Sequence, residues 1–137
     1  MLKLQITLSE SKLSPLDIEN FQSQFNYSLP QNVIKLISKF NGGLIKNSDD
    51  VRKLLPIKYG KLTIEELIDT HQISEQNIPQ GFLPIALDYS DNPIAINLNE
   101  GEDYCKIFLF ELDFEGEGFI IANSLEELLS VNSIDEL

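Results

Sequence analysis

The chain has 137 residues, of which 42% are hydrophobic and 23% charged, an ordinary balance for one globular domain with its own core. Its net charge of −12 gives a field that repels nucleic acid and anionic lipid, so we expect neither as a partner. No run of about 18 apolar residues could span a membrane. With an alternating N-terminus in place of a signal peptide and one cysteine, we expect a cytoplasmic protein with a single domain over residues 1–137.

The charge is unevenly distributed along the chain. Residues 1–62 hold nine of the ten Lys and Arg residues and five acids, a net +4, whereas residues 63–137 hold one Lys and seventeen acids, a net −16. Surplus acid of this kind keeps a domain soluble. It also steers a basic partner toward the acidic half. The charge by itself leaves both interpretations open.

The first elements carry clear local signals. Leu2, Leu4, Ile6 and Leu8 alternate with polar residues, which predicts a half-buried strand. A helix should follow over 15–25, because Ser14 and Asp17 have capping-box spacing and Pro15 suits the first helical position. Its apolar stripe consists of Ile18, Phe21 and Phe25.

The stretch "LPQNVIKLISKFNGG", residues 29–43, predicts a second helix. Pro30 fits the first turn, and apolar residues recur at helical spacing through Phe40, so one face should point into the core. Asn41 and the two glycines after it are expected to take the left-handed conformation that ends a helix.

The second half of the chain is rich in strand signals. Thr63 and Glu66 predict a third capped helix, and Ser124 and Glu127 predict a closing one. Between them lie short β-rich runs at 82–88, 92–99, 105–113 and 118–123, separated by turn signals. We therefore expect a single α+β domain, with a meander-like antiparallel sheet and helices packed mainly on one face.

No residue pattern predicts catalysis. His71 is the one histidine and Cys105 the one thiol, and Cys105 shares strand parity with apolar residues, which favours a buried structural role. The chain lacks a G-x-S-x-G motif, and one histidine with one cysteine cannot build a normal zinc site. We expect no enzymatic activity and no cofactor.

The acidic run near residue 115 invites two further hypotheses. Asp113, Glu115, Glu117 and Gly118 match the first positions of a calcium loop, yet the twelfth position is Ser124 where a bidentate Glu is needed. Paired carboxylates could also hydrolyse glycosides, but the chain has no Trp to stack on a sugar. We expect no metal site here, and interpret the run as a solvated turn.

The stretch at 29–43, a predicted helix bounded by Leu-Pro and Asn-Gly-Gly, resembles the signature of the SUKH superfamily, the Smi/Knr-like proteins. The segments "LSPLDIENFQSQFNYSLP", "GFLPIALDYSDNPIAINL", "CKIFLFELD" and "IANSLEELL" are similar to further family segments and occur in the same order. The resemblance implies a non-catalytic protein-binding domain, most often a bacterial immunity protein that neutralises a toxin such as a nuclease. The alternative that it implies is a regulatory scaffold of the cell-wall-assembly type.

The acidic half and the resemblance together predict a contact surface for a protein partner, in which acids steer a basic toxin domain and tyrosines anchor it. An acidic sheet edge that discourages aggregation would look the same in sequence. The predicted contact residues are Asp88, Tyr89, Asp91, Glu100, Glu102, Asp103, Tyr104, Asp113, Glu115 and Glu117.

Overall fold

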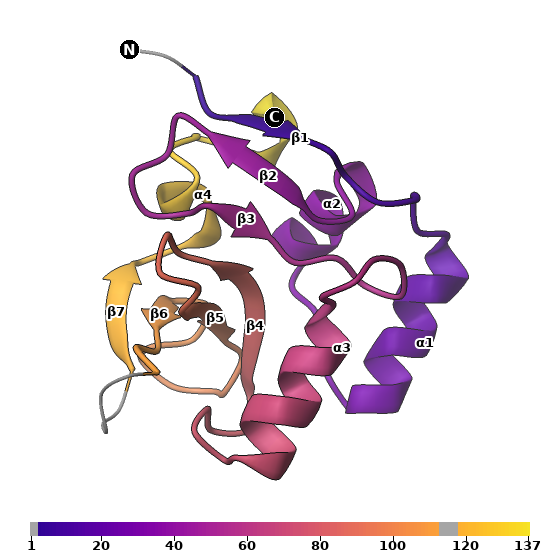
Figure 1. Ribbon diagram of the computed structural model, residues 1–137, viewed down its shortest axis with the longest axis vertical. Coiled ribbons are helices and arrows are strands. Elements are labelled where there is room, and N and C mark those ends of the chain that lie inside the picture. Colours follow the sequence, from indigo (N-terminus) through magenta and orange to yellow (C-terminus); the bar gives the residue numbers. More distant parts are fainter. Residues whose placement is uncertain (1–2, 113–117) are drawn as a thin grey trace.

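The computed structural model describes residues 3–112 and 118–137 (Figure 1). Within these residues the strands form one seven-stranded sheet whose spatial order follows the chain, and each strand is antiparallel to the next. The expected α+β fold with an antiparallel meander is confirmed. The strands are β1 (Gln5–Thr7), β2 (Gly43–Lys46), β3 (Lys53–Leu54), β4 (Phe82–Leu87), β5 (Pro93–Asn97), β6 (Ile107–Leu109) and β7 (Phe119–Ala122).

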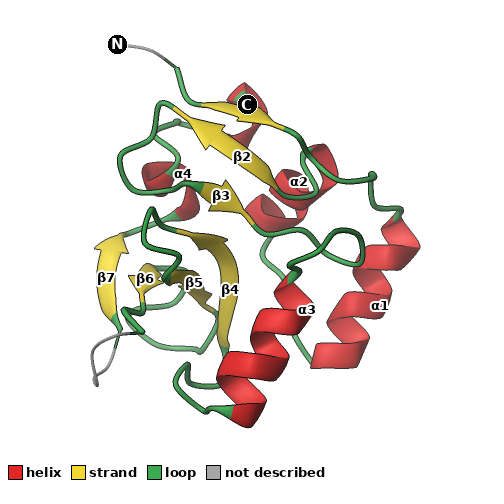
Figure 2. Ribbon diagram, in the orientation of Figure 1, coloured by secondary structure: helices red, strands yellow, loops and turns green. Residues whose placement is uncertain are grey.

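The described residues form four α-helices, each in a segment where the sequence predicts one (Figure 2). A π-helical segment, η1 (Ile68–Ser74), continues the third helix, and a 3₁₀ turn, η2 (Ile134–Glu136), follows the last. The sequence signals did not predict η1, β2 or β3. The α-helices are α1 (Pro15–Phe25), α2 (Gln31–Lys39), α3 (Ile64–Leu67) and α4 (Leu125–Leu128).

The predicted capping box of α1 is present. The Ser14 hydroxyl accepts a hydrogen bond from the Asp17 amide at 3.1 Å, and the Asp17 carboxylate accepts one from the Ser14 amide at 2.9 Å. Pro15 occupies the first helical position. Thr63 and Ser124 likewise accept hydrogen bonds from backbone amides in the first turns of α3 and α4.

The Leu-Pro and Asn-Gly-Gly boundaries of α2 differ in detail from the prediction. Pro30 is the capping residue, and the helix begins at Gln31. Asn41 is not left-handed; that conformation belongs to Gly42 and Gly43. Asn41 is only 2% exposed, and its amide donates to the Ser11 and Ile57 carbonyls and accepts from the Ile57 amide. A buried amide needs these partners, so tertiary contacts determine the role of Asn41.

Two predicted strands are shorter than expected. The first ends at Thr7, because Leu8 has a φ of 56° and its side chain is 75% exposed. In the described part of the run 105–113 the strand is limited to β6, and it starts after Cys105 because that residue has a φ of 67° in the preceding turn. Cys105 is half-buried against the core, not fully buried as predicted.

The helices share one hydrophobic core on one face of the sheet. Residues of all four α-helices pack with Ile94 and Ile96 of β5. Ala95, which points to the opposite face of the same strand, belongs to a smaller cluster with Ile78 and Phe110 that contains no α-helical residue. Two irregularities, in β4 and in the β6–β7 pairing, increase the local twist, and β4–β7 curl together at one end of the molecule (Figure 1).

Candidate functional site

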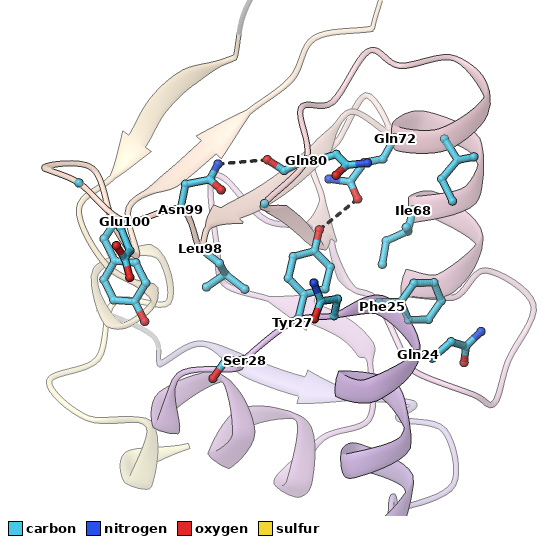
Figure 3. Close-up of a pocket in the computed structure, with 15 residues that line it drawn as sticks. Gln24, Phe25, Tyr27, Ser28, Ile68, Gln72, Gln80, Leu98, Asn99 and Glu100 are labelled. Atoms are coloured by element: carbon cyan, nitrogen blue, oxygen red, sulfur yellow. Dashed lines mark hydrogen bonds between the residues drawn. The ribbon is translucent and has the colours of Figure 1, made fainter.

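A polar cleft of ≈ 940 Å³ lies between the C-terminal end of α1, the π-helical segment η1 and the loop that follows β5 (Figure 3). Segments far apart in the sequence therefore meet at this site. The lining residues are Gln24, Phe25, Asn26, Tyr27, Ser28, Ile68, Gln72, Ile73, Gln80, Gly81, Leu98, Asn99, Glu100, Gly101 and Tyr104.

One wall of the cleft is held by the buried amide of Gln72, which is 6% exposed. Its nitrogen donates to the carbonyls of Pro79 at 2.8 Å and Phe82 at 2.5 Å, and its oxygen accepts from the Tyr27 hydroxyl at 3.1 Å (Figure 3). Burial raises the pKa of Tyr27, so this hydroxyl stays a neutral donor. The π-helical segment η1 thus positions Gln72 so that its side chain links Tyr27, just after α1, to Phe82 at the start of β4.

Another part of the cleft lining depends on close contact between Gly81 and Asn99. Gly81 has a φ of 90°, and a Cβ atom there would lie 2.0 Å from the Asn99 side-chain oxygen. The Asn99 amide donates to the Gln80 carbonyl at 3.1 Å. Only glycine leaves room for the amide at this point, so Asn99 covers the chain before β4.

The side chain of Asn97 holds the loop that carries Glu100 and Tyr104. The buried side-chain nitrogen of Asn97 donates to the Asp103 carbonyl at 3.1 Å. Its side-chain oxygen accepts from the backbone N–H of Asn99 at 2.9 Å. These bonds give the rim of the cleft a defined shape.

Chemically, the cleft offers hydrogen bonding with one charge. Five of its lining side chains are primary amides, two are tyrosines, and Glu100 is the one lining residue charged at neutral pH. Among the described residues, no side-chain hydrogen bond engages the amides of Gln24, Asn26 or Gln80. Free amides beside a carboxylate suit the binding of a polar ligand better than proton transfer.

The structure divides the predicted contact residues between two ends of β5. Glu100, Glu102, Asp103 and Tyr104 lie in the loop at the cleft, whereas Asp88, Tyr89 and Asp91 lie in the turn before β5. The five-residue strand separates these groups by about 17 Å. Asp113, Glu115 and Glu117 lie outside the described residues.

The group in the turn before β5 is occupied by contacts within the chain. The Asp88 carboxylate accepts from the amides of Ser90 at 2.9 Å and Asn92 at 2.8 Å. Asp91 forms an ion pair with Arg52, and the Tyr89 hydroxyl donates to the Ser48 carbonyl at 2.7 Å. These side chains attach the turn to the loop before β3, so the cleft group is the better candidate surface.

Sequence reasoning missed the part of the cleft contributed by α1 and η1. The segment "QSQFNYS", residues 22–28, carries three amides and a tyrosine at the end of a helix, a composition that could have marked it as a polar surface. No local signal could have indicated that Gln72 lies opposite Tyr27.

Among the described residues, no group of three or more His, Cys, Asp or Glu side chains is arranged to hold a metal ion. No described helix is long and apolar enough to cross a bilayer.

The meander sheet with helices on one face and a polar cleft at its curled end together define an α+β domain. The chain belongs to the SMI1 / KNR4 family (SUKH-1), whose family model matches residues 12–131. The matched range includes every residue that lines the cleft. No curated protein and no solved structure gives a match.

Proposed function

We propose that this chain is a non-catalytic protein-binding domain that acts as a bacterial immunity protein in the cytoplasm, where it binds and neutralises a toxin domain. The observation that carries the proposal is the polar cleft with an acidic loop on its rim, in a member of the SMI1 / KNR4 family.

The charge around the cleft supports a basic partner. Glu100 and Glu102 are exposed on the loop, and Lys106, the only cation of the acidic half, is paired with Asp103 at 3.1 Å. The other two carboxylates therefore keep their charge available for a cationic surface, which would raise the association rate. Tyr104, 47% exposed beside them, supplies the aromatic contact typical of tight interfaces.

The composition of the cleft supports binding without catalysis. No histidine, cysteine or lysine is among its lining residues. His71 lies in η1 with its Nδ1 atom 3.6 Å from the Glu75 carboxylate, and it does not line the cleft. A nucleophile with an adjacent base is the usual arrangement for covalent catalysis, and among the described residues no hydrogen bond joins a lining hydroxyl to the Glu100 carboxylate.

Co-expression tests the proposal. The C-terminal domain encoded immediately upstream would be expressed in a bacterial host with the wild-type chain, with an E100K/E102K variant, or with a D49K/D50K variant as control. Asp49 and Asp50 are exposed acids in the loop before β3, so the control makes the same charge change away from the cleft. We expect survival and a stable complex with the wild type and the control, and loss of both with E100K/E102K.

Two outcomes would contradict the proposal. Toxicity that the wild-type chain does not relieve would exclude immunity toward that domain. A stable complex that leaves the toxin active would favour the alternative, a regulatory scaffold.

A further inference from the structure

We propose that the cleft binds an extended polypeptide segment with a lysine or arginine side chain, contributed by the partner, and that Glu100 selects this cation. This inference rests on the proposed function and specifies the ligand chemistry of the same site. It follows from three features of the cleft: its free amides, its single carboxylate and its apolar floor.

The amides of the cleft fall into two groups with different roles. The side-chain amides of Gln72 and Asn99 donate hydrogen bonds to carbonyls of the chain itself and so shape the walls. Gln24, Asn26 and Gln80 line the same space without side-chain partners among the described residues. A primary amide donates and accepts like a peptide group, so these three match the alternating N–H and C=O groups of an extended segment.

The charge of the cleft points to a cationic side chain on that segment. Glu100 is exposed on the rim, and no lining residue is a lysine or arginine that could compete for it. A cationic ligand would gain an ion pair with this exposed carboxylate, which a neutral ligand cannot form. An anionic ligand would be repelled by it and by Glu102 next to it in the loop.

The floor of the cleft suits the aliphatic stem of such a side chain. Phe25 and Leu98 are half-buried, and Ile73 is 57% exposed at the edge. Lysine and arginine lay their methylene groups on surfaces of this kind while the charged head reaches a polar partner. The volume of ≈ 940 Å³ is at the upper end of the range for small-molecule pockets, which favours a peptide segment over a compact ligand.

An NMR titration of the labelled full chain tests the inference with three probes. These are the capped peptides acetyl-Gly-Arg-Gly-amide and acetyl-Gly-Gln-Gly-amide, and methyl glucoside as a neutral carbohydrate. We expect the arginine peptide to shift the side-chain amide signals of Gln24, Asn26 and Gln80, and to bind more tightly than the glutamine peptide.

Variants separate the two parts of the recognition. E100Q should weaken the arginine peptide about two- to fivefold, the contribution of an exposed ion pair, and leave the glutamine peptide unchanged. Q24A/Q80A should weaken both peptides, because it removes amides and no charge. D49N, which removes one exposed carboxylate away from the cleft, should bind both peptides like the wild type.

Several results would overturn the inference: no shift at the cleft with either peptide, equal affinity for both, or tighter binding of the glucoside. The toxin is absent from the NMR samples. A failure of the peptides to bind can therefore be distinguished from a failure of the chain to protect the host in the co-expression test. Rescue without peptide binding would retain immunity and reject this mode of recognition.

Discussion

At the scale of single residues, Asp17 links the start of α1 to the turn after β3. Its carboxylate caps the helix through the Ser14 amide and accepts a hydrogen bond from the Lys58 ammonium at 2.8 Å. The bond to Lys58, and next the one to Ser14, hold the pKa of Asp17 below its ordinary value of 3.8. The hydrogen bond to Asp17 in turn raises the pKa of Lys58.

This pair makes stability depend on pH in a defined direction. The folded-state pKa of Asp17 is lowered, so its contribution is complete above the unfolded pKa and is lost as the pH falls through the folded one. Asp17→Asn should therefore lower the free energy of unfolding by a constant amount above about pH 5, and the difference from wild type should shrink toward about pH 2. Urea unfolding at a series of pH values measures it.

Glu19→Gln is the matched control, because Glu19 is an exposed acid on the same helix. It should show no such pH-dependent difference. A difference between wild type and Asp17→Asn that stays constant across the whole pH range would show that the carboxylate charge is not what stabilises the contact.

At the scale of elements, β1 depends on a close approach to the first residue of β2. Gly43 has a φ of 137°, and a Cβ atom there would lie 2.7 Å from the Thr7 carbonyl oxygen and 2.9 Å from the Ile6 side chain. Thr7 and Ile6 are two of the three residues through which β1 pairs with β2. A side chain at this position would push β1 off the sheet.

Gly43→Ala and Gly101→Ala form a matched pair that isolates this contact. Gly101 has nearly the same φ, 138°, with nothing within 4 Å of a Cβ atom built there. Backbone strain should cost each variant roughly 1–3 kcal/mol. Gly43→Ala should lose about 1–3 kcal/mol more through the steric clash, with faster hydrogen exchange in β1. Equal unfolding free energies would show that β1 accommodates the methyl group.

At the scale of the whole molecule, the basic and acidic halves of the sequence share one hydrophobic core, but few ion pairs among the described residues join them, Arg52 with Asp91 being one. Lys35 pairs with Asp135 at 3.3 Å, and the Lys39 ammonium donates to the Leu137 carbonyl at 2.8 Å. Seventeen acids share residues 63–137 with a single lysine. Like charges concentrated in one part of a compact chain repel each other.

Salt should therefore stabilise this protein. Raising NaCl from about 20 mM to about 500 mM shortens the screening length severalfold and should raise the urea midpoint of the wild type. A triple variant of exposed acids, E66Q/D69N/E111Q, should be more stable at low salt and gain less from added salt. If both chains respond equally, the effect comes from general salting-out and not from the charges.

Much of the fold follows from signals that act within a few residues. The side-chain caps of Ser14, Thr63 and Ser124 each span three residues, so the sequence predicts where α1, α3 and α4 begin. Strands β4 and β5 also follow from local patterns, because short apolar runs bounded by turn residues are typical of buried strands. The family follows too, since its segments are short and collinear.

What the sequence by itself determined is thus the class of fold, the order of its main elements and the family. Only the tertiary structure decided the role of Asn41, the π-helical turn η1 and the cleft. The physical reason is the range of the interactions: Tyr27 and Gln72 are 45 residues apart, Asn41 and Ser11 are 30 apart, and no local pattern encodes which buried amide meets which carbonyl. The predicted strand at 92–99 already separated the two groups of the predicted acidic surface, but only the tertiary structure placed the later group beside the cleft, because α1 and η1 come to it from distant parts of the chain.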